Sequence, residues 1–178
     1  MKTASYQRTR WLTLIGTIIT QFALGSVYTW SLFNGVLSEK LGEPVSQVAF
    51  SFGLLSLGLA ISSSVAGKLQ ERFGVKRVTM ASGILLGLGF FLTAHSSNLM
   101  MLWLSAGVLV GLADGAGYLL TLSNCVKWFP ERKGLISAFA IGSYGLGSLG
   151  FKFIDSQLLA TVGLENTFVI WGAIVLVM

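Results

Sequence analysis

The sequence has few charged residues, two prolines, one cysteine and one histidine. Charged residues make up 11% of the 178 residues, whereas a typical soluble domain has about 25%. So few charges cannot cover the surface of a water-soluble domain. The hydrophobic share of 53% and the 22 glycines instead suit closely packed membrane helices. The composition therefore indicates an all-α membrane protein.

The scarcity of cysteine and histidine excludes several kinds of chemistry. Cys125 is the single cysteine, so no intrachain disulfide is possible, and the sequence has no metal-ligand spacing. His95 is the single histidine, which excludes a His-based metal site or triad. A membrane-embedded enzyme would need clustered His, Asp or Glu, and the acids are scattered. We therefore expect no metal, no cofactor and no enzymatic activity.

Long apolar runs divide the chain into membrane-spanning segments. A helix needs roughly 20 apolar residues to cross the hydrocarbon core of a bilayer. Five runs meet or approach that length, at about 11–33, 45–66, 78–94, 99–126 and 134–154. A sixth run, 166–178, begins near Asn166 and has about 13 residues. We therefore expect a transmembrane domain at 11–178 with a truncated sixth helix.

The first run has an alternative interpretation as a cleavable signal peptide. Basic residues precede it, and Ala23-Leu24-Gly25 loosely resembles a small-x-small cleavage site. However, the apolar run continues past that site to Phe33. This continuation favours a helix that spans the bilayer.

Lysine and arginine are distributed unevenly between the segments that separate the runs. Ten of the twelve lie at the N-terminus, after the second run and after the fourth. Lys40 and Lys152 lie on the opposite side. Because basic segments remain in the cytoplasm, the pattern predicts a cytoplasmic N-terminus over residues 1–10. Topology thus explains the net charge of +5, and we expect no binding to nucleic acid.

The loop after the second run carries a motif. It reads Gly67-Lys68-Leu69-Gln70-Glu71-Arg72-Phe73-Gly74-Val75-Lys76-Arg77. Its residue types, spacing and position resemble the signature loop of the major facilitator superfamily, with Glu71 where Asp is commoner. The resemblance implies a conformational-switch loop, whose contacts separate as a transporter rocks, formed by Gly67, Glu71, Arg72, Gly74, Lys76 and Arg77. The alternative is a simple basic cytoplasmic loop.

Two further stretches resemble one branch of that superfamily, the oxalate/formate antiporters. They are Gly25-Ser26-Val27-Tyr28-Thr29-Trp30-Ser31-Leu32-Phe33 and Lys127-Trp128-Phe129-Pro130-Glu131-Arg132-Lys133-Gly134. An enterobacterial inner-membrane member of the branch is similar. The resemblance implies the N-terminal six-helix half of a twelve-helix transporter, built as a 3+3 inverted repeat in a bacterial inner membrane. The residues that hold the substrate carboxylates in this branch lie in the missing C-terminal half.

The resemblance implies a secondary transporter of small carboxylates, such as oxalate, formate or pyruvate. It would work by alternating access, driven by exchange or by protons. The run Gly142–Gly150 lacks the proline often found in the fifth helix of antiporters, so exchange and proton symport both remain open. The alternative function is a membrane-embedded carboxylate sensor. We expect the chain alone to be inactive, because a half-bundle exposes a polar cavity face to lipid.

Helix one supplies the candidate cavity residues. Family architecture places helices one and four beside a cavity near the midplane of the bilayer. Gln21 and Tyr28 are seven residues apart, share one helix face and can donate hydrogen bonds to a carboxylate. Trp30 is the third candidate. The alternatives are an interhelical hydrogen bond for Gln21 and interfacial anchoring for Tyr28 and Trp30.

Asp114 is the acid that lies deepest in a predicted helix, near the middle of the fourth run. A charge there costs roughly 2.5–3.5 kcal/mol, so the residue is expected to be functional or neutralised by a partner. Because an acid is unfavourable beside an anionic substrate, we expect Asp114 to couple transport to protons. Lys152 and Asp155, near the end of the fifth run, suit an interfacial lysine with an acidic neighbour.

Several glycines are spaced for helix packing. Gly107, Gly111 and Gly115, and likewise Gly83 and Gly87, recur every four residues and predict close backbone contacts. The run Gly145–Gly150 matches the dinucleotide fingerprint GxGxxG. No strand precedes it and it lies in a membrane helix, so we expect no nucleotide site.

Overall fold

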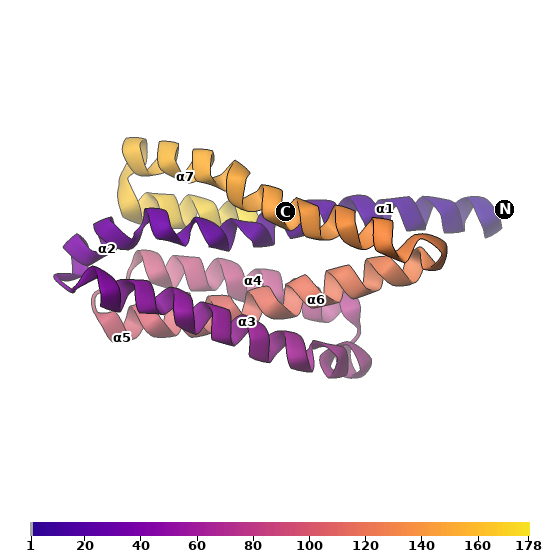
Figure 1. Cartoon of the computed structure of the whole chain (residues 1–178), viewed down its shortest axis with the longest axis horizontal. Coiled ribbons are helices and arrows are strands. Elements are labelled where there is room, and N and C mark those ends of the chain that lie inside the picture. The colour runs from indigo at the N-terminus through magenta and orange to yellow at the C-terminus, as the bar shows by residue number, and fades with distance from the viewer. Residues whose placement is uncertain (1) are drawn as a thin grey trace.

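The structure is a computed structural model that describes residues 2–178, with side chains from Ser5 onward. Met1 and the side chain of Lys2, one of the predicted cytoplasmic bases, lie outside the described part. Residues 2–178 form helices and turns without a strand. The helices make six passes along one bundle, which confirms the predicted all-α fold (Figure 1).

The first pass is an α-helix that changes to a 3₁₀-helix near its centre. It consists of α1 (Lys2–Leu24), the 3₁₀ segment η1 (Gly25–Leu32) and α2 (Asn34–Leu41). The helix therefore begins before Trp11 and continues beyond Phe33. A 3₁₀-helix has three residues per turn instead of 3.6, so η1 shifts the register of the side chains that follow it.

The second and third passes are a hairpin of two long helices. They are α3 (Val45–Phe73) and α4 (Val75–Ala94), and Gly74 alone separates them. Gly74 has a φ of 81°, which glycine tolerates and other residues rarely adopt. Since α3 continues to Phe73, most of the motif between Gly67 and Arg77 is helical.

The fourth pass contains a change of helical geometry just before Asp114. It runs through α5 (Leu99–Leu102), the π-helical segment η2 (Trp103–Leu109) and α6 (Val110–Trp128). Short π-helical segments are frequent at functional sites. A 3₁₀ turn, η3 (Pro130–Arg132), then leads into the last helix.

The fifth and sixth passes together form α7 (Lys133–Val177). Gly163 interrupts the helix with φ 81° and ψ 176°, and the chain reverses there. Figure 1 shows the returning segment ending beside α1, near the middle of the bundle. Among the described residues, five helices are long and apolar enough to cross a membrane, the last of them Pro130–Val177, which holds both passes.

The core between the first, third and sixth passes is aromatic. The rings of Phe90 and Trp171 stack with their centroids 4.1 Å apart, and those of Phe33 and Trp171 lie 5.5 Å apart. The Trp171 ring nitrogen donates a 2.8 Å hydrogen bond to the Ser26 hydroxyl. Buried aromatic pairs of this kind contribute specific geometry as well as area, so the sixth pass is firmly attached to the first.

The predicted glycine contacts are confirmed on the fourth pass, in η2 and α6, and only in part on α4. A Cβ added at Gly115 would lie 2.8 Å from the Cα of Leu59, so the second and fourth passes touch through their backbones. Gly87 lies against the sixth pass. The prediction is wrong for Gly83, which has no described atom within 4 Å of its Cβ position because it borders a cavity.

Candidate functional site

Asp114 forms a buried hydrogen bond with the fifth pass. Its side chain is 0% exposed, and its Oδ2 accepts a 2.8 Å hydrogen bond from the Tyr144 hydroxyl in α7. Its Oδ1 is buried and has no partner among the described residues. A buried acceptor without a partner costs free energy, so this carboxyl is only half satisfied.

Tyr144 belongs to a cluster of three tyrosines from three different passes. Its ring centroid lies 4.9 Å from that of Tyr118 and 5.6 Å from that of Tyr28, both edge-on. The ring centroid of Tyr28 also lies 5.7 Å from that of Phe52 in α3. Tyr28 is 49% exposed, whereas Tyr118 and Tyr144 are half-buried. This tyrosine cluster (Tyr28, Tyr118, Tyr144) therefore opens at Tyr28 and reaches Asp114 at its other end.

Two glycines let the first and fifth passes approach closely beside the cluster. A Cβ at Gly25 would overlap the carbonyl oxygen of Tyr144, and a Cβ at Gly147 would overlap the carbonyl oxygen of Phe22. Any larger residue at either position must push α7 away from α1. That shift would separate Tyr144 from Tyr28.

Gln21 is fully buried and joins the first pass to the fourth. Its Nε2 donates hydrogen bonds of 2.9 Å to the Tyr118 carbonyl and 3.1 Å to the Thr121 hydroxyl. Its Oε1 is buried without a partner within residues 2–178. Gln21 does not share the exposed face of Tyr28, because the helix changes to 3₁₀ at Gly25.

Trp30 lies away from the tyrosine cluster. It is 2% exposed, and its ring lies 5.8 Å from Phe168 of the sixth pass and 6.5 Å from Phe33. The structure therefore brings Tyr28 and Asp114 together through Tyr144, places Gln21 behind them and puts Trp30 in the aromatic core.

The residues of the predicted conformational-switch loop lie together at one end of the bundle. Arg10 and η3 lie at the same end, which we call the basic end. All six are exposed: Gly67, Glu71, Arg72, Gly74, Lys76 and Arg77. The Arg72 guanidinium lies 5.3 Å from the Phe73 ring centre. In the described chain, neither Glu71 nor Arg72 forms an ion pair.

Instead, Arg10 and Glu131 form the ion pair of the basic end. Glu131 lies in η3, so the pair ties the start of the first pass to the turn between the fourth and fifth. The Arg10 guanidinium also lies 4.0 Å from the centre of the Phe129 ring, a cation–π contact.

Asp155 is a second buried carboxyl, whereas the sequence interpretation placed it near the end of the fifth run as the acidic neighbour of an interfacial Lys152. It is 0% exposed, and its Oδ2 accepts a 2.7 Å hydrogen bond from Thr29. Lys152 is exposed and is not its partner in the described chain. The fifth pass continues to Gly163, so Asp155 lies within the helix and not at its end. Asp155 follows Ala140, Gly147 and Phe151 at intervals of seven and four residues, on the same buried face of the helix. This helical spacing is the sequence signal that could have predicted its burial.

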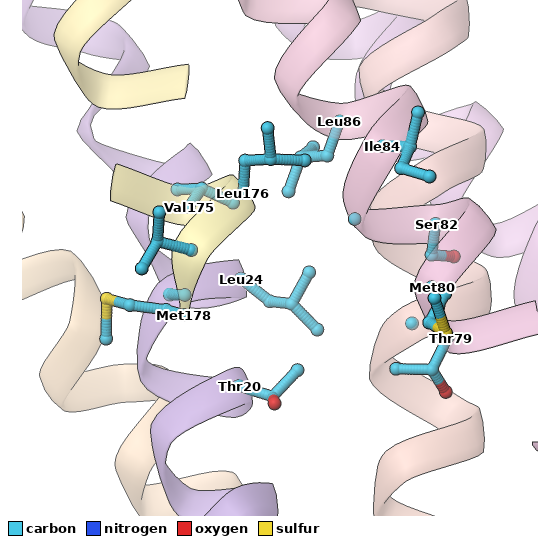
Figure 2. A pocket seen from close by; sticks show the side chains of 14 residues that line it. Thr20, Leu24, Thr79, Met80, Ser82, Ile84, Leu86, Val175, Leu176 and Met178 are labelled. Atoms are coloured by element: carbon cyan, nitrogen blue, oxygen red, sulfur yellow. The ribbon is translucent and has the colours of Figure 1, made fainter. Parts of the chain in front are cut away.

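A separate cavity of about 270 Å³ lies between α1, α4, α6 and the last residues of α7. Figure 2 shows Thr20 and Leu24 facing Thr79 and Ser82 across it. Its lining includes neither a charged side chain nor a member of the tyrosine cluster. A carboxylate would find no cation there, so this cavity is not the candidate site.

The sequence model of the Major Facilitator Superfamily matches residues 11–178. The chain therefore belongs to the Major Facilitator Superfamily, whose members are transporters rather than enzymes. This finding confirms the family resemblance of the switch loop and identifies the bundle as the N-terminal half of the family's fold.

Curated relatives match almost the whole chain. The uncharacterized MFS-type transporter YhjX of Escherichia coli (strain K12) is 92% identical over 178 residues, which are 100% of this chain and 44% of that protein. The oxalate:formate antiporter of Oxalobacter formigenes is 26% identical over 166 residues, 93% of this chain and 40% of that protein. Monocarboxylate transporter 6 of Homo sapiens is 26% identical over 167 residues, 93% of this chain and 33% of that protein. The chain thus spans less than half the length of these relatives.

Proposed function

We propose that this chain is the N-terminal half of a secondary transporter for small carboxylates. The expected substrates are mono- or dicarboxylates like oxalate, formate and pyruvate. The names of two relatives, an oxalate:formate antiporter and a monocarboxylate transporter, support this class. The observation that carries the proposal is the tyrosine cluster, which runs from an exposed ring at Tyr28 to the buried acid Asp114.

The cluster has the chemistry to hold a small organic acid. Tyrosine hydroxyls donate hydrogen bonds to carboxylate oxygens, and the rings provide apolar walls for the short carbon skeleton. Tyr28 is the exposed member and would make the first contact. The cationic groups that neutralise the substrate would come from the other half of the transporter.

Tyr144 offers a physical link between substrate and proton. Its hydroxyl carries one hydrogen, which it donates to Asp114. A substrate carboxylate at the cluster would compete for that hydrogen and leave both oxygens of Asp114 without a donor. An ionised carboxylate without donors in a membrane helix is costly, so proton uptake by Asp114 would accompany substrate binding.

The basic end of the bundle is proposed to face the cytoplasm of a bacterium, at the inner membrane, with residues 1–10 outside the transmembrane domain 11–178. The concentration of lysine and arginine at that end supports this orientation. The switch loop and the ion pair of Arg10 with Glu131 would then loosen and re-form during alternating access.

Counterflow into proteoliposomes tests the proposed substrate class, with labelled oxalate, formate and pyruvate. The 178-residue chain is compared with an extended chain, made by adding the remaining residues of the 92% identical relative. Uptake by the extended chain alone supports a carboxylate carrier that needs both halves. Uptake by neither, with both chains folded, contradicts the carboxylate assignment.

A further inference from the structure

Thr29 lies between two hydrogen-bond acceptors. Its Oγ1 is 2.7 Å from Oδ2 of Asp155 and 2.9 Å from the carbonyl oxygen of Ser26. A hydroxyl carries one hydrogen, so Thr29 can donate to only one acceptor at a time. Asp155 and Ser26 are 0% exposed and Thr29 is 4% exposed, so bulk water does not reach the acceptor that loses the bond.

The protonation state of Asp155 decides which acceptor receives the hydrogen. When the carboxyl is ionised, Thr29 donates to Asp155. When it is protonated, the carboxyl donates to the Thr29 oxygen, and Thr29 is free to donate to Ser26. Oδ1 of Asp155 is also buried and has no partner in the described chain, an arrangement that a permanently ionised carboxylate rarely has.

In the part of the chain that the structure describes, no charged neighbour forms an ion pair with Asp155. The titratable groups on η1, α2 and α7, besides Asp155 itself, are Tyr28, Glu39, Lys40, Lys133, Tyr144, Lys152 and Glu165. The Tyr28 ring faces Tyr144, Lys40 pairs with Glu165 at 2.8 Å, and Lys152 is exposed. Within residues 2–178, none of them is an ion-pair partner of Asp155.

The 3₁₀ segment η1, which contains Thr29, is hydrogen-bonded to the fifth and sixth passes. Thr29 and Ser26 lie in η1, and Asp155 lies in the fifth pass. The Ser26 hydroxyl also accepts the 2.8 Å hydrogen bond of Trp171 from the sixth pass. Tyr28, the exposed member of the tyrosine cluster, is the residue before Thr29. A change at Thr29 therefore acts directly on the backbone that carries Tyr28.

We propose that Asp155 is a second proton-binding site, separate from Asp114, and that its protonation moves the Thr29 hydrogen from the carboxylate to the Ser26 carbonyl. The added bond from the Thr29 hydroxyl to the Ser26 carbonyl stabilises the 3₁₀ segment Gly25–Leu32. Proton binding at Asp155 thus sets the rigidity of the segment that presents Tyr28. This inference does not depend on which substrate is carried.

Infrared difference spectroscopy of the extended chain without substrate, recorded as the pH is varied, tests the proton site. One titrating carboxyl band is lost in Asp155→Asn and kept in Asp114→Asn. The same band shifts in Thr29→Val, which removes the hydrogen-bond partner of the carboxyl. Thr161→Val is the matched control, since its hydroxyl bonds only within its own helix, 2.8 Å from the Gln157 carbonyl, and it leaves the band unchanged.

Hydrogen exchange of the amides in Gly25–Leu32 tests the structural consequence. In the unmodified chain the protection of these amides, measured relative to their intrinsic exchange rate at each pH, increases on the acidic side of the titration. Asp155→Asn keeps the high protection at every pH, because the neutral amide imitates the protonated acid, and Thr29→Val abolishes the pH dependence of the protection. If Asp155→Asn does not fold, the shift of the band in Thr29→Val decides the question.

Identical infrared titrations with and without Asp155, or an Asp155 carboxyl that never titrates while the protein is folded, overturn the proposal. So does a protection of the Gly25–Leu32 amides, relative to their intrinsic exchange rate, that is independent of pH. Because no transport is measured, a failure of carboxylate counterflow would contradict the proposed function and leave these results intact.

Discussion

The Tyr144 hydroxyl in α7 donates a 2.8 Å hydrogen bond to the Asp114 carboxylate in α6. The same tyrosine ring touches Tyr28, which is exposed at the surface of the bundle. One side chain therefore connects a surface that a ligand can reach with an acid that a ligand cannot reach. Under the proposed function, this arrangement would separate the group that contacts the substrate from the group that binds the proton.

Asp114→Asn is expected to remove the pH dependence of transport in the extended chain. Asparagine keeps the size of the side chain and still accepts the Tyr144 bond, but it cannot take up a proton. The measurement is the initial rate of labelled carboxylate uptake as a function of pH. A rate profile that keeps its original pH dependence would show that Asp114 has no coupling role.

Tyr144→Phe is expected to destabilise the bundle by about 1–3 kcal/mol, because Asp114 then loses its hydrogen-bond donor in a buried site. Tyr28→Phe is the matched variant, since it removes a hydroxyl from an exposed ring. It should leave the melting temperature unchanged and raise the KM for uptake roughly tenfold, which corresponds to about 1.4 kcal/mol. Equal effects of the two variants on stability would contradict the assigned roles.

Gly147→Ala is expected to separate the first and fifth passes, because its Cβ would overlap the carbonyl oxygen of Phe22. Overpacking of this kind typically costs about 1–3 kcal/mol. Gly145→Ala is the control on the same helix, since its Cβ would meet no described atom within 4 Å. Thermal melting in detergent should show a lower melting temperature for Gly147→Ala and an unchanged melting temperature for Gly145→Ala. A decrease of the same size for Gly145→Ala would mean that helix contact is not the cause.

Lys40→Met is expected to loosen the end of the bundle opposite the basic end. The Lys40 ammonium lies 2.8 Å from both the Glu165 carboxylate and the Ala94 carbonyl, so it joins three chain segments. Hydrogen exchange around Gly163 should become faster in this variant and remain unchanged in Lys152→Met. Because the ion pair is exposed, the difference should shrink at high salt. A salt-independent difference would exclude the ion pair as its cause.

Hydropathy and one loop motif were sufficient to predict the bundle and its family. The apolar runs could be found because each must cross the bilayer, and the motif Gly67–Arg77 supplied the family. Asp114 could also be predicted as a candidate site residue, since an acid in the middle of an apolar run rarely has a purely structural role. Its partner Tyr144 could not, because the pairing depends on how closely α6 and α7 approach.

Other parts of the site required the three-dimensional packing. The 3₁₀ segment beginning at Gly25 moved Tyr28 away from the face of Gln21, and no local pattern signals that change. From the sequence, Trp30 was expected to lie beside the cavity or at the membrane interface. In the structure, Phe168 of the sixth pass packs against it and it is buried. Asp155 was assigned to a helix end, because the apolar run weakens there although the helix continues to Gly163.

The most direct test of the central claim is counterflow of labelled oxalate, formate and pyruvate by the extended chain, with Tyr28→Phe measured in parallel. We predict uptake of at least one of these acids and weaker uptake by Tyr28→Phe at low substrate concentration. Folded extended protein that takes up none of the three, or that transports one equally well without the Tyr28 hydroxyl, would contradict a carboxylate site at the tyrosine cluster.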